Sequence, residues 1–178
     1  MTRRDLLLLA AAGAAQAQDK KAEKLAPYYP TPELIVERML QLAELKPGEK
    51  MYDLGSGDGR IVIMAARKFG ADATGVELDE DLVHRSRNAI HKAGLDKSAH
   101  IIPGDILKQD YSAADVVTVY MLPIANDLLR PIMEKQLRKG ARLVAHDFQF
   151  SAWTPEKVVD IEDDGEGRSH TLFLYRIK

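Results

Sequence analysis

The sequence has no cysteine among its 178 residues, which excludes disulfide bonds and thiolate chemistry. It has only five histidines, and because no two of them have the spacing of metal ligands along the chain, the sequence predicts no metal site. The formal net charge of -2 provides no broad basic face, so nucleic acid is not an expected partner. A chain of this length predicts a single domain with a sizeable core.

A long hydrophobic run is also missing, although the N-terminus has a short one. Arg3 and Arg4 precede an apolar run over residues 6–15, and Ala15-Gln16-Ala17 fits a small-x-small cleavage site. This pattern is typical of a twin-arginine export signal and predicts a signal peptide over residues 1–17. The run is too short to span a membrane, so we expect no stable membrane span. A disordered or helical extension is the alternative interpretation.

The glycine-rich stretch over residues 51–60, MYDLGSGDGR, organises the rest of the chain. It predicts a short buried strand, a turn containing Gly55, Gly57 and Gly59, and a helix over residues 60–69. Alternate glycines let the backbone approach a ligand closely, and free N–H groups at the helix start favour electron-rich ligand groups. The spacing differs from the dinucleotide fingerprint G-x-G-x-x-G.

Acidic and aromatic residues follow the next predicted strands. A strand over residues 73–78 contains Glu77 near its end, about 20 residues after the glycine turn, the distance expected for a ribose-binding carboxylate. Asp105 follows the third strand and Tyr120 lies near the end of a continuous apolar run. Ligands of parallel sheets bind beyond the carboxyl ends of the strands, so these three side chains and Gly55 are predicted to form one site.

The remaining elements alternate between strands and helices. The predicted helices cover residues 32–45, 79–93 and 123–139, and the predicted strands cover residues 99–103, 116–121, 141–150, 158–161 and 171–177. This order predicts an α/β fold, a doubly wound, Rossmann-like, mostly parallel seven-stranded sheet with helices on both faces. The last two strands are joined by an acidic, glycine-rich turn and are predicted to form an antiparallel hairpin.

The segment over residues 27–32, PYYPTP, precedes the first predicted helix. Thr31 is a suitable N-cap with Pro32 at the first helical position, so the segment can be a capped helix entry. Two tyrosines beside a rigid turn can equally form a lid over a ligand. Residues 18–26 before it are charged and low in apolar residues, which predicts a linker. Both interpretations of the tyrosine segment stay open at this point.

Four stretches together resemble a known group of enzymes: residues 27–32, 52–63, 75–78 and the run VVTVYMLP over 116–123. They are similar to small class I, seven-strand S-adenosylmethionine-dependent methyltransferases. Within that class they resemble the mitochondrial lysine methyltransferases of the ATP synthase c subunit and the adenine nucleotide translocator, and the archaeal protein lysine methyltransferases. The resemblance covers residues 27–178, which we interpret as the methyltransferase domain. It implies a protein-lysine N-methyltransferase that uses S-adenosyl-L-methionine.

The resemblance also implies the roles of particular side chains. It places the substrate amine near Tyr120, the candidate catalytic residue. Phe148 and Trp153 can wall the amine pocket with it or simply pack between the last strands. The implied cofactor contacts come from Tyr29, Thr31, Asp53, Gly55, Ser56, Gly57, Glu77, Asp105 and Ile106.

The expected reaction is an in-line displacement by a neutral lysine amine, which depends mainly on placement in a dry pocket. The expected partner is therefore a protein that presents a lysine, and the enzyme itself is expected to be a monomer. A small-molecule methyltransferase on the same fold is one alternative. An exported, non-catalytic binding protein is another, because the export signal favours the periplasm while the cofactor is a cytoplasmic metabolite.

Overall fold

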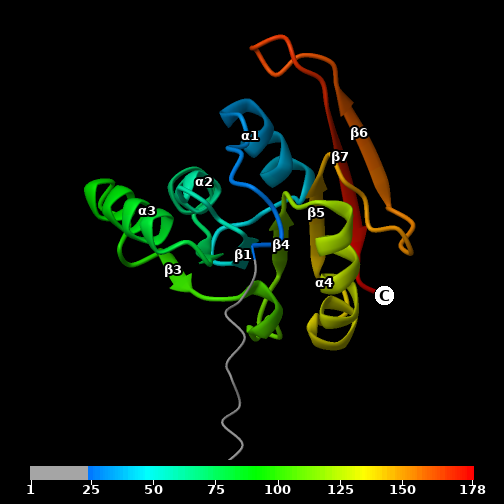
Figure 1. The fold of residues 1–178 in the computed structure, drawn as a ribbon, viewed down its shortest axis with the longest axis horizontal. Helices are drawn as coiled ribbons and strands as arrows, with labels where there is room; N and C mark the ends of the chain where they lie inside the picture. The colour runs from blue at the N-terminus through cyan, green and yellow to red at the C-terminus, as the bar shows by residue number, and fades with distance from the viewer. Residues whose placement is uncertain (1–23) are drawn as a thin grey trace, which may run out of the picture.

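The computed structural model describes residues 24–178, and Figure 1 shows a single mixed sheet flanked by helices. The predicted signal peptide over residues 1–17 lies outside the described residues, as does most of the predicted linker. The described chain begins at Lys24 and leads into the tyrosine-containing segment.

The sheet has seven strands in the order β3-β2-β1-β4-β5-β7-β6. Neighbours from β3 to β5 are parallel, while β7 runs antiparallel to both β5 and β6. The predicted doubly wound fold with an antiparallel C-terminal pair is therefore confirmed. The strands are β1 Lys50–Leu54, β2 Asp72–Glu77, β3 Ala99–Pro103, β4 Val116–Val119, β5 Arg142–His146, β6 Lys157–Ile161 and β7 His170–Arg176.

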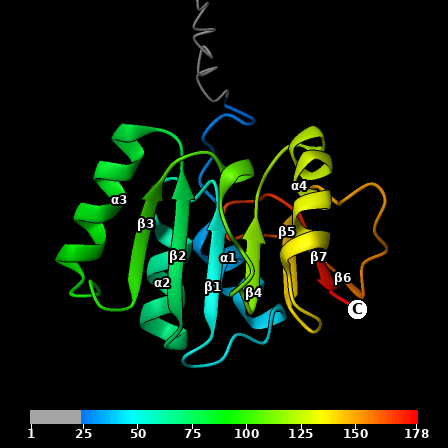
Figure 2. The same cartoon turned by 90° about the horizontal axis from the view of Figure 1, so that it is seen from below.

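Helices cover both faces of the sheet and bury two separate apolar clusters. The first cluster joins the sheet to the first three helices, and the second joins it to the fourth helix and a short 3-10 turn. Figure 2 shows β1 to β4 with their arrowheads pointing toward the N-terminal segment, drawn in blue. The helical elements are α1 Glu33–Leu42, α2 Arg60–Phe69, α3 Glu80–Lys92, η1 Ile106–Lys108 and α4 Pro123–Gln136.

The start of α1 differs from the sequence prediction. The helix begins at Glu33, so Pro32 is the N-cap and no side chain caps the helix. Thr31 is buried, and its Oγ1 lies 3.4 Å from Nδ1 of His146. The predicted capping role of Thr31 is therefore wrong, because its hydroxyl is turned into the interior toward β5.

The predicted strand over residues 141–150 is too long. β5 ends at His146, and Asp147 adopts a left-handed conformation with φ of 59°. The backbone N–H of Thr171 donates to Oδ1 of Asp147 over 2.9 Å. This contact fixes the turn, so the chain leaves the sheet directly after His146. β4 likewise ends at Val119, which makes Tyr120 the first residue beyond the sheet.

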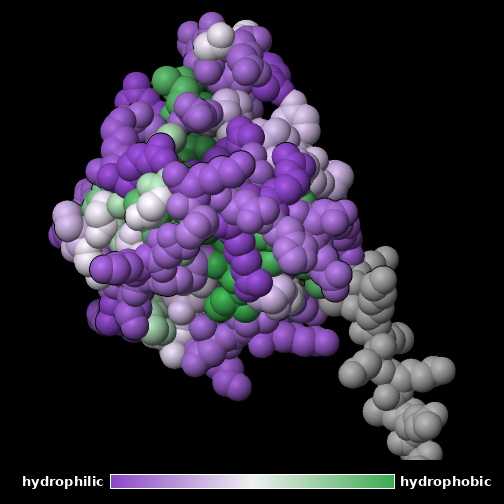
Figure 3. All heavy atoms as spheres, turned by 90° about the vertical axis from the view of Figure 1, so that its left-hand side faces the viewer, coloured by the Kyte–Doolittle hydropathy of each residue, from purple (hydrophilic) through white to green (hydrophobic). Residues whose placement is uncertain are grey.

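The surface around α3 is mainly polar. Figure 3 views the molecule from the side on which α3 lies in Figure 1, and hydrophilic side chains cover most of that face. Arg85, Arg87 and Lys92 of this helix are exposed, as a solvated helix face requires. Between residues 24 and 178 there is no helix with the length and apolar character needed to cross a membrane.

Candidate active site

A pocket lies beyond the carboxyl ends of β1, β2 and β4, and it encloses about 850 Å³ including its open mouth. The structure brings together all ten side chains or backbone positions predicted from the sequence. The pocket is lined by Tyr29, Thr31, Asp53, Gly55, Ser56, Gly57, Glu77, Asp105, Ile106 and Tyr120.

The glycine turn is fastened to β2. The N–H groups of Gly55 and Ser56 donate to the carbonyl oxygen of Val76 over 2.9 and 3.0 Å. Gly55 and Gly57 have φ values of 74° and 54°, in the left-handed region that glycine adopts without steric cost. The turn is thus held rigidly, with its backbone facing the pocket.

A buried carboxyl group at the end of β1, that of Asp53, fits the charge of S-adenosylmethionine. Burial raises the pKa of Asp53 to about 7 even though Thr118 donates a hydrogen bond of 2.7 Å to its Oδ1. A cationic ligand group would favour the ionised carboxylate, and the cofactor carries both a sulfonium and an ammonium. Oγ of Ser56 is buried and has no hydrogen-bond partner among the described residues, because the side chain lies against Gly75 of β2.

Glu77 has a structural role that its place in the sequence does not indicate. Its Oε2 accepts from the N–H of Gly57 and its Oε1 from the N–H of Asp79, each over 2.8 Å. The carboxylate therefore ties the glycine turn to the start of α3. Each oxygen retains a second lone pair, so the carboxylate can still accept hydrogen bonds from a ligand.

Asp105 and Ile106 border the pocket after β3. Oδ1 of Asp105 accepts from the N–H of Leu107 over 2.9 Å, which caps the short η1 turn. Ile106 is buried in the second apolar cluster. The capping contact holds the Asp105 carboxylate in place, so it can serve as a fixed acceptor for a ligand.

The tyrosine-containing segment crosses the mouth of the pocket. Tyr28 packs on the glycine turn so closely that a Cβ on Gly57 would come within 2.6 Å of its ring. Tyr29 receives a hydrogen bond from Arg168, whose guanidinium lies 5.5 Å from the ring centroid. Lys24 pairs with Asp79 over 2.6 Å. These contacts favour the lid interpretation over the capped helix entry.

Nothing in the sequence indicates the contacts that Lys24, Tyr28 and Arg168 make around the pocket. The contacts of Lys24 and Arg168 join residues 55 and 139 positions apart in the chain. No local pattern could indicate such pairs, because each joins residues that meet only in the completed fold.

Tyr120 lies between the pocket and a polar cluster at the end of β5. Its hydroxyl donates to Oδ2 of Asp147 over 3.3 Å, and its ring lies against His146 with 3.8 Å between centroids. Burial, reinforced by Asp147, raises the pKa of Tyr120 to about 12, so the phenol stays neutral near pH 7. Its donor is used by Asp147, which leaves the oxygen as an acceptor.

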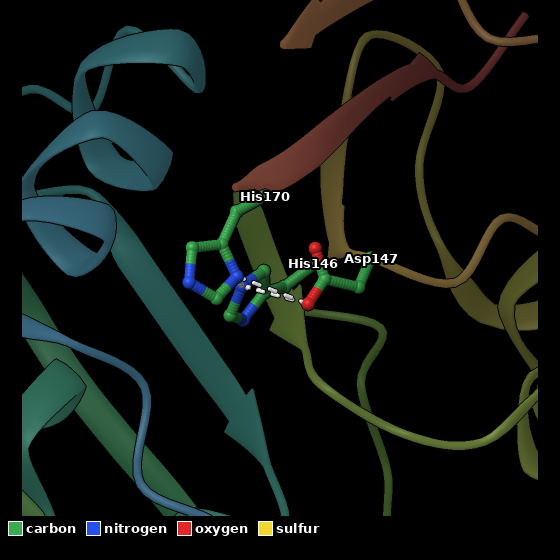
Figure 4. A group of neighbouring side chains, drawn as sticks. All are labelled: His146, Asp147 and His170. Carbon is green, nitrogen blue, oxygen red and sulfur yellow. Dashed lines mark hydrogen bonds and ion pairs between the residues drawn. The ribbon is translucent and has the colours of Figure 1, made fainter. Parts of the chain in front are cut away.

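The cluster behind Tyr120 consists of His146, Asp147 and His170 (Figure 4). The histidines look scattered in the sequence, and that interpretation is wrong for His146 and His170. β5 and β7 are antiparallel neighbours with His146 opposite Leu172, which brings His170 to within 2.9 Å of His146 between ring nitrogens. Burial lowers the pKa of His146 to about 4, so its imidazole is neutral.

Phe148 and Trp153, the other two aromatic residues considered for the pocket wall, are placed differently from Tyr120. Phe148 stacks beside Tyr120 with 6.2 Å between ring centroids, although it does not line the pocket. Trp153 packs against Phe150 and its Nε1–H donates to Glu134. For Trp153 the packing interpretation is therefore the one the structure favours.

The sheet order, the glycine turn, the acid that ends β2 and the acid that follows β3 together define a class I S-adenosylmethionine-dependent methyltransferase. A crystal structure described as an RNA methyltransferase from Salinibacter ruber in complex with S-adenosyl-L-homocysteine has the same fold, with a TM-score of 0.79 and 44% identity. The match covers 84% of this chain and 94% of that one.

Residues 53–157 match the model of the ANTKMT methyltransferase domain, and the chain belongs to this family. It is 41% identical to a protein-lysine N-methyltransferase of Saccharolobus islandicus, over 85% of this chain and 93% of that protein. It is 37% identical to the adenine nucleotide translocase lysine N-methyltransferase of Mus musculus, over 74% of this chain and 55% of that protein. The recognised resemblance, the fold and the use of S-adenosylmethionine are thus confirmed.

Proposed function

We propose that this methyltransferase modifies lysine side chains of proteins. The observation that supports this acceptor best is the 41% identity over 93% of the archaeal protein-lysine N-methyltransferase. The pocket residues support the same reaction, because they combine a rigid cofactor turn with an aromatic hydroxyl at the methyl-transfer edge of the sheet. No inserted domain interrupts residues 24–178, which leaves the pocket accessible to a side chain on a large partner.

The residues predicted from the sequence would hold the cofactor. Glu77 would accept from the ribose hydroxyls, Asp105 and Ile106 would border the base, and Asp53 would face the cationic end. When bound, S-adenosylmethionine supplies an electrophilic methyl group. The lid over residues 27–31 excludes water from this group, which matters because desolvation favours the neutral amine of lysine over its ammonium form.

Tyr120 orients the acceptor amine. Because its hydroxyl proton is donated to Asp147, the phenol oxygen can accept an N–H of the lysine amine and so direct the nitrogen lone pair at the methyl group. Lysine has a reference pKa near 10.4, and the half-buried position of Tyr120 helps to lower it by desolvation. Tyr120 acts by orientation, so the reaction requires no strong general base.

The rim of the pocket supports a protein acceptor. Leu122 and Ile124 follow the pocket residues Tyr120 and Met121 directly and are exposed, as is Leu128 one turn further along α4. Exposed apolar side chains grouped beside a site are typical of protein contact surfaces. We therefore propose that the substrate protein contacts the start of α4 while its lysine enters the pocket.

RNA is the second candidate acceptor, because the similar Salinibacter protein is described as an RNA methyltransferase. Incubation of the purified chain with a host lysate and radiolabelled cofactor distinguishes the acceptors. We expect acid-precipitable label that protease removes and ribonuclease leaves, with methyl-lysine found by mass spectrometry. Label that ribonuclease removes, or label only in small metabolites, would contradict the proposal.

We further propose that residues 27–178 form the catalytic domain and that residues 1–17 act as an export signal. The support for the signal is the sequence pattern around Arg3 and Arg4. Fractionation of the host cell, with N-terminal sequencing of the recovered protein, tests it. Full-length protein confined to the cytoplasm would contradict the export proposal and leave methyl transfer unaffected.

A further inference from the structure

We infer that His146, Asp147 and His170 form a binding site for one divalent transition-metal ion of the zinc and iron type. The proposed methyl transfer uses Asp147 only as the acceptor for the Tyr120 hydroxyl and requires no metal ion. The three side chains offer two imidazole nitrogens and one carboxylate oxygen that converge on one point at the junction of β5 and β7, as Figure 4 shows. Two histidines and one carboxylate are a ligand set that Zn²⁺ and Fe²⁺ accept.

The spacing of the three ligand atoms fits such an ion. Nε2 of His146 lies 2.9 Å from Nδ1 of His170, Nδ1 of His170 lies 3.1 Å from Oδ2 of Asp147, and Nε2 of His146 lies 3.4 Å from the same oxygen. An ion about 2.1 Å from each ligand separates adjacent ligands by roughly 3.0 Å in octahedral and 3.4 Å in tetrahedral geometry. The observed separations cover this range, so little rearrangement is needed.

Each ligand is oriented by a second contact on its far side. Nε2 of His170 lies 3.2 Å from the buried carboxylate of Asp164, and Nδ1 of His146 lies 3.4 Å from Oγ1 of Thr31. With protons on these outer nitrogens, the inner nitrogens of both rings present lone pairs to the shared point. Metal-binding histidines commonly have such outer partners, which fix the tautomer and the ring orientation.

The carboxylate is also held in position. Oδ1 of Asp147 accepts from the N–H of Thr171, while the N–H of Asp147 donates to the carbonyl of Thr171 over 2.7 Å. These two contacts maintain the left-handed φ of 59° at Asp147, a conformation that costs free energy for a non-glycine residue. The backbone is thus strained in a way that aims Oδ2 at the two histidines.

The site has a route to solvent through one ligand. The side chains of His146 and His170 are 0% and 5% exposed, whereas that of Asp147 is 24% exposed. Three protein ligands with access from the Asp147 side leave coordination positions for water. The Tyr120 hydroxyl lies next to this opening because it donates to Oδ2 of Asp147, so a bound ion would adjoin the proposed amine position.

The alternative to a bound metal ion is a proton on His170, at the point where the three ligand atoms converge. A protonated His170 would donate to both Asp147 and His146 and leave no room for an ion. Measurement of metal binding by the full chain, purified without a histidine tag and treated with chelator, decides between the two. The probes are Zn²⁺ in equilibrium dialysis and Co²⁺ in visible absorption, near pH 7.5 and without cofactor or protein substrate.

We expect one Zn²⁺ per chain with micromolar or tighter affinity, a Co²⁺ spectrum with nitrogen-ligand bands, and a higher melting temperature with Zn²⁺. Asp147→Asn and His170→Gln should each weaken binding at least tenfold. His91→Gln is the matched control, because His91 pairs with Asp96 on the surface without a third ligand, and it should bind as the wild type does.

Absence of stoichiometric binding below about 100 μM Zn²⁺ would overturn the inference, as would equal binding by Asp147→Asn and His91→Gln. Circular dichroism of each variant confirms folding. Asp147→Asn keeps the size of a partly exposed side chain, so it tests the site even if His170→Gln fails to fold. Because no methyl transfer is measured, the result is independent of the acceptor proposed above.

Discussion

At the scale of single residues, Asp53 shows how burial prepares a group for a ligand. Its carboxyl is fully enclosed beneath the glycine turn, and burial raises its pKa to about 7. The unfolded chain would lose this proton near pH 4, while the folded protein keeps it until about pH 7. Between these values the folded state holds the extra proton, so stability falls as the pH rises.

Replacement of Asp53 by Asn should remove this loss of stability with rising pH. We expect the free energy of unfolding of the wild type to fall between pH 4 and pH 7, and that of Asp53→Asn to change less. At pH 8 the variant should be the more stable, by at most roughly 4 kcal/mol, and it should bind S-adenosylmethionine more weakly. Urea titrations across this pH range measure the difference. Parallel pH profiles for the two proteins would contradict the prediction.

Tyr120 offers a test of orientation as opposed to packing. Tyr120→Phe keeps the ring that lies against His146 and removes only the hydroxyl, so we expect the single-turnover rate to fall at least tenfold with cofactor affinity nearly unchanged. The control is Tyr52→Phe, since Tyr52 is a half-buried tyrosine outside the pocket. A silent Tyr120→Phe would leave Tyr120 as part of the pocket wall.

Some residues could be predicted from the sequence and others could not, for a physical reason. Gly55, Glu77 and Asp105 could be found because each directly follows or closes a strand whose pattern is local. His146 and His170 could not, because they meet only through the register of β5 and β7. Asp147 was hidden in a predicted strand, since nothing local indicates its left-handed turn.

At the scale of elements, the contact between β2 and the glycine turn depends on a missing side chain. A Cβ on Gly75 would lie 2.4 Å from Oγ of Ser56 and 2.8 Å from Cδ1 of Ile101. Both distances are shorter than van der Waals contact allows, so any side chain here would push the turn away from β2.

Gly75→Ala should therefore destabilise the fold by about 1–3 kcal/mol, the usual effect of overpacking, and weaken cofactor binding through displacement of Ser56. Thermal unfolding and isothermal titration measure the two effects. Thr74→Ala on the same strand removes volume where Gly75→Ala adds it, and it should leave cofactor affinity intact. If Gly75→Ala bound the cofactor normally, the turn would be more adaptable than its contacts indicate.

The lid is a second element whose contacts can be weakened separately. Arg168→Ala removes the hydrogen bond and the cation-π contact with Tyr29. We expect cofactor affinity to fall about two- to fivefold, as the loss of roughly 0.5–1 kcal/mol implies, mainly through faster dissociation. Stopped-flow measurement of release provides the test, with Arg176→Ala as the control because Arg176 pairs with Glu156 away from the lid. Equal release rates in both variants would argue against a lid.

At the scale of the whole molecule, the alternation of strands and helices was enough to predict the fold. It also predicted that the pocket lies at the carboxyl ends of the strands. The contacts that close the pocket could not be predicted in this way, because Lys24 and Arg168 come from opposite ends of the domain. Contacts of that kind are set by the completed fold. The sequence therefore predicted which residues line the pocket better than how the pocket is enclosed.

The proposed docking surface belongs to this scale too. Ile124 is 68% exposed beside the pocket, so Ile124→Ser should raise KM for a protein substrate several-fold and leave cofactor affinity and kcat near wild type. Val158→Ser is the control, since Val158 is a 47% exposed apolar residue on β6. An unchanged KM in Ile124→Ser would remove the start of α4 from the proposed contact surface.

The position of β7 has a consequence for synthesis of the protein. β6 leaves the ribosome before β7, but in the finished sheet its neighbour is β7, which also pairs with β5. During translation, β6 therefore has no strand to join, and the outer edge of β5 stays open until β7 emerges. Open strand edges promote association between chains. A ribosome that pauses between these two strands would expose this edge, so the nascent protein is most vulnerable to aggregation just before the last strand is made.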